Sequence, residues 1–439
     1  MTASEFFKGK KVTLMGLGLL GRGIGDAEFL ARAGADLIVT DLKSETDLAP
    51  ALERLKGFGT IVFHLGGHRL EDFENRDFIV RAPNAPIDSP FLAHARERGV
   101  PIGMDASLFA RFTAASIVGV TGTRGKSTVT HLVHAMLRAG GRSAHLGGNV
   151  RDMATLPLAD TLSASDIAVL ELDSWQLQGF EEASISPRIA VWTTFMPDHM
   201  NYYHGDVERY FRDKAAIARF QKPGDTFITS RHIKEEVEAK FGPLLGSSIT
   251  DPAIPDDWPI GLEGAHNRMN TAFAAAAARS LGVCEKIIKE TLQNFKALPG
   301  RLELLGEKDG ILFYNDSNST TPEACIAALE ALAPKRRPII LIGGGSDKQL
   351  DFTALAPRIE HEVQHLILFK GSATDKLLPL LPKTLAPEIV SSMDDAFKKA
   401  CAAAKPGDIV LLSPAATSFG IFRNEYDRGD QFRRLFTAL

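Results

Sequence analysis

The strongest chemical signal in this chain is a glycine-rich loop that carries a lysine and four hydroxyl residues. Residues 121–128 read TGTRGKST between an apolar run and a helical pattern. Glycines let successive backbone N–H groups turn toward an anion, and the start of a helix adds the positive end of its dipole. Lys126 would supply a charge for the outer phosphates of ATP, and the Ser127 hydroxyl can bind Mg²⁺. The predicted phosphate-binding residues are Gly122, Thr123, Arg124, Gly125, Lys126, Ser127 and Thr128.

This loop departs from the strict GxxxxGK pattern, because Val120 stands where the first glycine is expected. The alternative interpretation is a glycine-rich turn with a solvated lysine. A second glycine-rich loop, GLGLLG at 16–21, follows another apolar run, and Asp41 ends the next run. Such an arrangement can hold a pyrophosphate at a helix start, with the acid on a ribose hydroxyl. It indicates a diphosphate-bearing nucleotide, and both a nicotinamide-dependent oxidoreductase and a purely structural turn stay open.

Three further residues could act near the phosphate loop. Glu171 directly follows the apolar run 167–170, and His199 follows the run 189–193. An acid at the carboxyl end of a parallel strand points toward the ligand crevice, as a Mg²⁺-binding acid must. Lys214 lies in the helical pattern 210–220. A helix cap, a surface histidine and a solvated lysine are the structural alternatives, and the grouping of the three after the phosphate loop favours a catalytic site.

The elements that position these residues alternate along the whole chain. Short apolar runs and helical patterns follow one another, which indicates an α/β fold with parallel sheets. The helix after the phosphate loop carries an apolar stripe that would pack on a sheet: Val129, Leu132, Val133, Met136 and Leu137. Strands are predicted at 11–15, 36–40, 61–64, 78–80, 116–121, 167–172, 189–193, 311–314, 338–342, 365–369 and 408–412. The length of 439 residues predicts several domains, which we place at 1–108, 109–297 and 298–439.

Composition excludes several classes of protein. A charged fraction of 24% and a net charge of −4 give no basic field for binding nucleic acid. No apolar run reaches the ~18–20 residues that a membrane-spanning helix needs, so we expect no membrane insertion. The 3 cysteines have no metal-ligand spacing, which favours a reduced, cytoplasmic location.

The order of motifs resembles that of the Mur ligases, which build the peptidoglycan precursor. The series TGTRGKST, ELDSWQLQ, DHMNYYHG, GAHNRMN, LPGRLE, NDSNSTTPEA, GGGSDK and SPAATSF spans essentially the whole chain. GLGLLG, GGGSDK and SPAATSF are most similar to the glutamate-adding members. The resemblance implies a Rossmann-like amino-terminal domain, a central P-loop ATPase domain and a Rossmann-like carboxy-terminal domain. It also implies a monomer that uses ATP to join D-glutamate to UDP-N-acetylmuramoyl-L-alanine through an acyl phosphate.

The resemblance also implies roles for matching positions. The UDP substrate would contact Leu19, Leu20, Asp41, Asn149 and His199. Catalytic roles would fall to Lys126, Glu171, His199 and Lys214. Mg²⁺ would be held by Ser127, Glu171, His199 and Lys214, the last as a carbamylated lysine. ATP would also contact Asn267, Asn270, Arg301 and Asp316, and glutamate would contact Thr320, Lys348 and Ser418.

Three positions depart from the family pattern. Asn318 stands where D-glutamate enzymes often have lysine, Glu425 replaces an apolar contact, and Asp173 stands where serine is usual. The first two bear on the amino-acid pocket, so L-glutamate stays open as the substrate. A non-catalytic ATP-gated binding protein and a folate-type polyglutamate ligase are further alternatives. The folate-type enzyme would not explain a UDP-type first domain, and an oxidoreductase would not explain the later motifs.

Overall fold

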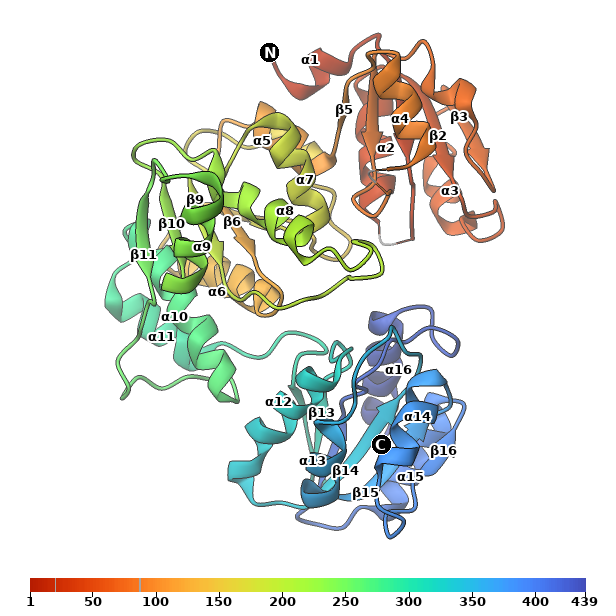
Figure 1. The fold of residues 1–439 in the computed structure, drawn as a ribbon, viewed down its shortest axis with the longest axis vertical. Helices are drawn as coiled ribbons and strands as arrows, with labels where there is room; N and C mark the ends of the chain where they lie inside the picture. The colour runs from red at the N-terminus through yellow and green to blue at the C-terminus, as the bar shows by residue number, and fades with distance from the viewer. Residues whose placement is uncertain (20, 87) are drawn as a thin grey trace. The chain divides into compact units, whose positions relative to one another are not determined.

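The computed structural model describes residues 1–439 except 20 and 87, and these residues form two compact units (Figure 1). The first unit comprises Met1–Asp257 and Asn270–Thr291, and the second comprises Trp258–Met269 and Leu292–Leu439. The described residues form three sheets, of which two lie in the first unit and one in the second. The architecture confirms the predicted α/β class with parallel sheets.

The first sheet is parallel, with strand order β3-β2-β1-β4-β5. Its strands are β1 (Lys11–Met15), β2 (Asp36–Asp41), β3 (Ile61–Leu65), β4 (Phe78–Arg81) and β5 (Ile102–Gly103). The helices in this part of the chain are α1 (Ala3–Phe7), α2 (Arg22–Arg32), α3 (Ala49–Leu55), η1 (Leu70–Phe73), α4 (Pro90–Glu97) and α5 (Asp105–Phe112). The strand order reverses between β1 and β4, and such a switch point opens a ligand crevice at the carboxyl ends of the strands.

The second sheet is also parallel, with order β11-β10-β9-β6-β8-β7. Its strands are β6 (Ser116–Thr121), β7 (Ala144–Gly148), β8 (Ile167–Glu171), β9 (Ile189–Trp192), β10 (Thr226–Thr229) and β11 (Ser247–Thr250). Its helices are α6 (Lys126–Ala139), η2 (Leu156–Asp160), α7 (Ser174–Ala183), α8 (Val207–Arg219) and α9 (Arg231–Phe241). The five stripe residues of α6 are fully buried, so the predicted packing face is confirmed. Helices α10 (Ala265–Ser280) and α11 (Glu285–Asn294) follow in the chain.

The third sheet has the order β12-β13-β17-β14-β15-β16, and only the β12–β13 pair is antiparallel among the described strands. Its strands are β12 (Glu303–Lys308), β13 (Ile311–Asn315), β14 (Ile339–Gly344), β15 (Val363–Phe369), β16 (Glu388–Val390) and β17 (Ile409–Leu412). Its helices are α12 (Pro322–Leu332), η3 (Ala333–Lys335), α13 (Leu355–Glu362), α14 (Ser372–Leu377), η4 (Leu378–Leu380), α15 (Met393–Ala403) and α16 (Glu425–Ala438). The inner strands β14 and β17 are buried on both faces, as in parallel sheets generally.

Each predicted strand is present, with ends that differ by a few residues at most. The sequence missed β5, β7, β10, β11, β12 and β16, which are short or lie at or next to a sheet edge and carry little continuous apolar sequence. Each sheet falls within one of the predicted ranges 1–108, 109–297 and 298–439, and these domain boundaries stay a prediction. Within the described chain, we find no helix with the length and apolar character required to cross a membrane.

Candidate active site

The phosphate loop joins β6 to α6 at the carboxyl edge of the second sheet. Gly125 caps α6 in the left-handed conformation, with φ of +86°. A Cβ on Gly125 would lie 2.3 Å from Asn270 Oδ1, and one on Gly122 would lie 2.0 Å from Thr193 Oγ1. Both positions therefore exclude larger residues. The same contacts bring Asn270, a predicted ATP residue, against the loop.

Two lysines converge on this loop. Lys126 Nζ donates to Gly122 O at 2.9 Å and to Thr123 O at 3.2 Å. Lys214 Nζ, from α8, donates to the same Gly122 O at 3.0 Å and to Thr121 Oγ1 at 3.4 Å. Lys214 is only 1% exposed, and burial, followed by the charge of Lys126, holds the pKa of Lys214 well below its usual value. The loop is thus a cationic cradle with one reactive, readily deprotonated amine.

Glu171 and Asn149 lie at the same sheet edge. Because β6 pairs with β8 and β8 pairs with β7, the ends of these strands are neighbours of the phosphate loop. Glu171 is the last residue of β8 and is 4% exposed. Asn149 Nδ2 donates to Glu171 Oε1 at 3.2 Å, and Asn149 N donates to Glu171 O at 2.7 Å. The fold therefore brings together a buried carboxylate, an amide and the two lysines along one edge.

His199 follows β9 at this edge, and its neighbour Asp198 contacts the phosphate loop. Arg124 Nη1 donates to Asp198 Oδ2 at 2.8 Å, while His199 N donates to Asp198 Oδ1 at 2.9 Å. The His199 ring packs 4.7 Å from the Trp175 ring. Asp198 is not among the site residues predicted from the sequence. Its signal was the DHM sequence after a strand end, but only the fold shows that it reaches Arg124.

Asp173, the residue that replaces the usual serine, starts α7. Its carboxylate accepts a hydrogen bond from Gln176 N at 2.8 Å, and Asp173 N donates to Gln176 Oε1 at 3.3 Å. This reciprocal pair is a capping box, which aspartate forms as well as serine does. The departure at position 173 is therefore structurally conservative.

The amino-terminal loop is organised around Asp41. Asp41 is 5% exposed, and its Oδ2 accepts hydrogen bonds from Leu17 N at 2.8 Å and Gly18 N at 3.0 Å. Its Oδ1 accepts from Lys43 N at 2.8 Å. The carboxylate thus holds the loop itself, and its predicted contact with the UDP substrate stays a prediction. Leu19 is 51% exposed beside it, whereas Leu20 lies outside the described residues.

In the second unit, Asp316 lies just after β13 and is buried. Its Oδ1 accepts from Leu302 N at 2.9 Å and its Oδ2 accepts from Ser413 Oγ at 2.8 Å. Burial raises the pKa of Asp316 to about 7. Leu302 directly follows Arg301, so two predicted ATP residues lie at neighbouring positions. Asn267, the remaining predicted ATP residue in this unit, lies in the first turn of α10 and donates from Nδ2 to Glu263 O at 2.7 Å.

The predicted glutamate residues lie on loops that the structure ties together. Ser346 and Thr417 exchange backbone hydrogen bonds of 3.2 and 3.0 Å, which pairs the GGGSDK loop of Lys348 with the SPAATSF loop of Ser418. Arg428, from α16, is fully buried and donates to Ala416 O at 3.1 Å and Ser317 O at 2.7 Å. It thereby links the Ser418 loop to the loop that carries Thr320. Arg428 was not predicted as a site residue. In the sequence it is an arginine within the stretch that forms α16, and nothing beside it indicates that it is buried.

The two atypical residues of the amino-acid pocket occupy different surroundings. Asn318 N donates to Gly300 O at 2.9 Å, and the buried Asn318 Oδ1 has no hydrogen-bond partner. Glu425 is the first residue of α16, after the N-cap Asn424, where a negative charge is favourable for the helix dipole.

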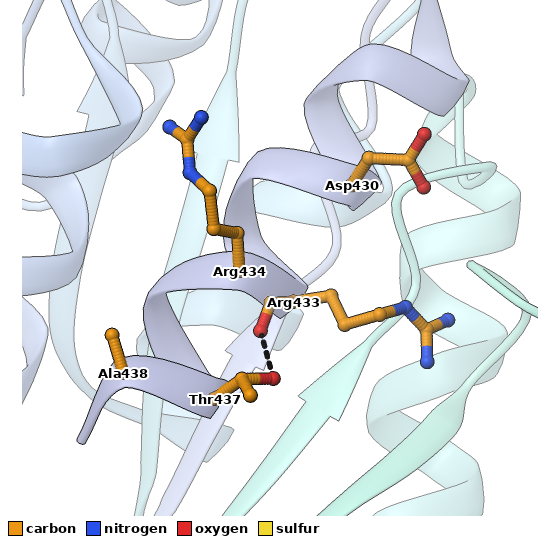
Figure 2. A pocket seen from close by; sticks show the side chains of 5 residues that line it. All are labelled: Asp430, Arg433, Arg434, Thr437 and Ala438. Atoms are coloured by element: carbon orange, nitrogen blue, oxygen red, sulfur yellow. Dashed lines mark hydrogen bonds between the residues drawn. The ribbon is translucent and has the colours of Figure 1, made fainter.

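A surface hollow of about 350 Å³ lies along α16 and does not coincide with any predicted site residue (Figure 2). Its lining residues all belong to this helix: Asp430, Arg433, Arg434, Thr437 and Ala438. Arg433 is engaged by Glu303 Oε2 at 2.6 Å. Because one helix supplies the whole lining, the convergent loops described above are a better guide to function than this hollow. Among the described residues, no group of three or more His, Cys, Asp and Glu side chains forms a metal-binding cluster.

The parallel α/β fold and the lysine-bearing loop define a phosphate-loop enzyme class. Residues 120–253 match the Mur ligase middle domain, and residues 300–416 match the Mur ligase, glutamate ligase domain. The chain belongs to the Mur ligase family. A UDP-N-acetylmuramoylalanine–D-glutamate ligase of Roseiflexus sp. (strain RS-1) is 40% identical, with 97% of this chain and 98% of the relative covered. One of Borreliella burgdorferi (strain ZS7) is 35% identical over 97% of each chain.

Solved structures show the same fold at lower sequence identity. UDP-N-acetylmuramate–alanine ligase from Thermotoga maritima has a TM-score of 0.64 at 17% identity, with 98% of this chain and 99% of that chain covered. MurF ligase from Thermotoga maritima, solved in complex with ADP, has a TM-score of 0.60 at 17% identity, with 100% and 96% covered. These similarities extend over the full chain, so the family fold covers both units.

Proposed function

We propose that this chain is an ATP-dependent, ADP-forming ligase that joins D-glutamate to UDP-N-acetylmuramoyl-L-alanine in peptidoglycan precursor synthesis. Family membership and the activity named for relatives at 34–40% identity support the reaction. The observation that carries the chemistry is the convergence of Lys126 and Lys214 on Gly122 O. A cradle of this kind suits a reaction in which both partners are anions.

The reaction begins when the L-alanyl carboxylate attacks the γ-phosphate of ATP. The carboxylate oxygen forms a bond to phosphorus, the bond to the β-phosphate oxygen breaks, and ADP leaves. Lys126 would stabilise the negative charge on the transferring group, where fixed charges act most strongly if water is excluded. Arg301 and the buried Asp316 would bind ATP from the carboxy-terminal domain.

The second step forms the amide. The glutamate amine attacks the acyl carbonyl, phosphate leaves, and the amine gives up a proton. Lys348, Thr320 and Ser418 would orient glutamate through loops that Arg428 and the Ser346–Thr417 pairing hold in place. The amino-terminal domain, 1–108, would bind the UDP portion with Leu19, Leu20 and Asp41, while Asn149 and His199 would lie near the muramoyl group.

Lys214 would act as a carbamate. Its lowered pKa favours the neutral amine, which can attack CO₂ and release a proton to leave an N-linked carboxylate. Oxygen ligands are those that Mg²⁺ prefers, and the Glu171 carboxylate and Ser127 hydroxyl fit this preference. When bound by these groups, His199 and the carbamate, Mg²⁺ would supply charge neutralisation at the phosphates.

We further propose that the central and carboxy-terminal domains span 109–297 and 298–439, and that the enzyme acts as a cytoplasmic monomer.

L-Glutamate is the second candidate substrate, because Asn318, with its unpaired Oδ1, replaces a lysine that D-glutamate enzymes often have. Asn318→Lys should shift the ratio of D- to L-glutamate kcat/KM toward the D-enantiomer by about 3-fold or more, equivalent to ~0.6 kcal/mol. An unchanged ratio would remove the argument from position 318.

The proposed function is tested with purified protein, UDP-N-acetylmuramoyl-L-alanine, ATP, MgCl₂ and each glutamate enantiomer. We expect one phosphate released per amide formed, with product mass measured in the same reaction. Omission of any single component should stop phosphate release. A protein that consumes no ATP with the complete mixture would overturn the proposal.

A further inference from the structure

A buried arginine lies where the first sheet meets α7. Arg81 is the last residue of β4 and is 1% exposed. Its Nη1 donates to Ala85 O at 3.3 Å and its Nη2 donates to Gln178 Oε1 at 3.0 Å. The carboxylate Glu182 is 4.0 Å away and partly exposed. A buried cation needs both hydrogen bonds and a compensating charge. The hydrogen bond from Arg81 to Gln178 matters here because Gln178 also contacts a buried carboxylate.

Gln178 connects Arg81 to a buried acid by hydrogen bonds from the two ends of its amide. Its Nε2 donates to Asp213 Oδ2 at 2.7 Å, and the same oxygen accepts from Tyr203 OH at 2.9 Å. The amide of Gln178 is therefore oriented by charge at both ends, with its oxygen toward the guanidinium and its nitrogen toward the carboxylate. Gln178 is 2% exposed, and Tyr202 OH also donates to its Oε1 at 3.3 Å.

The two ends of this chain of hydrogen bonds adjoin the two glycine-rich loops. Ala82 directly follows Arg81, and its Cβ lies 2.7 Å from the position that a Cβ on Gly16 would occupy. Asp213 directly precedes Lys214, whose Nζ donates to Gly122 O in the phosphate loop. Ala82, next to Arg81, thus packs closely on Gly16 of the amino-terminal loop, and Lys214, next to Asp213, contacts the phosphate loop from α8.

We propose that Arg81, Gln178 and Asp213 form a positioning relay that couples nucleotide-sugar binding at the amino-terminal loop to the placement of Lys214 at the phosphate loop. The inference rests on the proposed function for the identity of the two ligands. Hydrogen-bonded networks with charged ends in a poorly solvated interior strengthen one another, so Gln178 should respond to a shift of Arg81 and pass it to α8. The coupling must be reciprocal between the two ligands.

Direct binding measurements test the relay. The dissociation constant of a non-hydrolysable ATP analogue with MgCl₂ is measured by calorimetry with and without saturating UDP-N-acetylmuramoyl-L-alanine. In the wild-type protein we expect the nucleotide sugar to tighten analogue binding by about 5-fold or more, the lower end of typical coupling between sites. In Gln178→Leu the ratio should fall to within about 2-fold of unity, while each ligand alone still binds.

Gln178→Glu separates a relay from mere burial of Arg81. Glutamate still accepts from Arg81, but when ionised it cannot donate to Asp213 and instead brings a like charge beside it. We expect this variant to stay folded and to lose the coupling. A purely structural role predicts instead that Gln178→Glu retains the wild-type ratio.

Arg96→Gln is the matched control. Arg96 on α4 contacts Glu182 on α7 at 3.3 Å, so this pair joins the same region of the first sheet to the same helix at a more exposed position. The coupling ratio of Arg96→Gln should equal that of the wild type. A wild-type ratio of one, or a wild-type ratio in either Gln178 variant, would overturn the relay even if turnover is normal. Absence of turnover and of nucleotide-sugar binding would overturn the proposed function and the relay with it.

Discussion

The two glycine-rich loops of the first unit have similar backbones but opposite electrostatic surroundings. Each joins a parallel strand to a helix that a left-handed glycine caps, Gly21 with φ of +81° and Gly125 with φ of +86°. The amino-terminal loop surrounds a carboxylate, because Leu17 N and Gly18 N both donate to Asp41. The phosphate loop is contacted by two lysine amines, because Lys126 and Lys214 both donate to Gly122 O, and the pKa of Lys214 is lowered by burial and by the charge of Lys126.

This difference shows why a glycine fingerprint does not identify a ligand. Glycines allow the turn, but the side chains that contact the loop decide which groups stay available to a ligand. At the amino-terminal loop, two N–H groups are already occupied by an internal anion. At the phosphate loop, the Lys126 ammonium group lies at a helix start, and the amine of Lys214, whose pKa is lowered, contacts the same carbonyl oxygen. The nicotinamide interpretation of the first loop therefore finds no support in its local contacts, whereas strong phosphate chemistry suits the second.

The largest effect is expected from removing the main cation of the phosphate loop. Lys126→Ala should lower kcat for phosphate release by about 10³-fold or more, because a charge aimed at the transferring group is lost. The far-ultraviolet circular dichroism and the unfolding midpoint should stay near those of the wild type, since Lys126 is only half-buried. Phosphate release within 10-fold of the wild type would contradict the cradle.

The activity that depends on Lys214 should respond to CO₂ as well as to mutation. Lys214→Met should lower kcat by about 10²-fold or more, and it should make turnover insensitive to bicarbonate. Wild-type enzyme prepared without CO₂ should lose activity and regain it on addition of bicarbonate, with a carbamate signal from ¹³C-labelled bicarbonate. If wild-type turnover does not depend on bicarbonate, Lys214 does not act as a carbamate.

The carboxylate of the amino-terminal loop should affect a different ligand. Asp41→Ala leaves the N–H groups of Leu17, Gly18 and Lys43 without their acceptor, at a cost of ~1–3 kcal/mol in the free energy of unfolding. We expect KM for the nucleotide sugar to rise by about 10-fold while KM for ATP stays within about 2-fold. Glu53→Ala, which removes an exposed acid of α3, serves as control. An equal rise in both KM values would contradict separate ligands for the two loops.

The smallest effect concerns a buried acid pair beside the amino-terminal loop. Asp26 on α2 and Asp105 on α5 are both buried, and burial together with their mutual repulsion raises the pKa of Asp26 well above its usual value. A carboxyl whose folded pKa is raised stabilises the fold below its unfolded pKa and loses that contribution as pH rises through the folded pKa. Asp26→Asn should therefore increase the free energy of unfolding by ~1–3 kcal/mol at pH 8, and by less at pH 5.

Chemical denaturation at the two pH values measures this difference. Glu28→Gln, on the same helix and more exposed, should show a difference between pH 5 and pH 8 close to that of the wild type. If Asp26→Asn increases the free energy of unfolding equally at both pH values, the pKa of Asp26 is not raised in the folded protein.

Much of this contrast could be predicted from the sequence, but its decisive contacts could not. Apolar runs set the strands, and parallel strands bring residues that follow them, such as Glu171 and His199, to one edge. The roles of Asp41 and Lys214 depend on contacts across 23 or more residues of chain, which periodicity does not encode. The sequence predicts that Asp41 contacts a ligand, which stays a prediction, and the structure adds that its carboxylate accepts hydrogen bonds from the loop.

Buried polar links were the least predictable feature. Gln178 and Arg428 are polar residues of α7 and α16, and their neighbours in the sequence do not indicate that they are buried. Both are buried because a second element packs over them, and their hydrogen bonds run to distant segments. Such residues are recognised only when the strand order and the helix packing are known.

The most direct test measures phosphate release by wild type, Lys126→Ala and Asp41→Ala with the complete substrate mixture at saturating ATP and increasing nucleotide sugar. We predict that saturation with nucleotide sugar restores Asp41→Ala to near wild-type kcat, while Lys126→Ala stays inactive at every concentration. Loss of kcat in Asp41→Ala at saturation, or recovery of Lys126→Ala, would contradict the separate roles of the two loops.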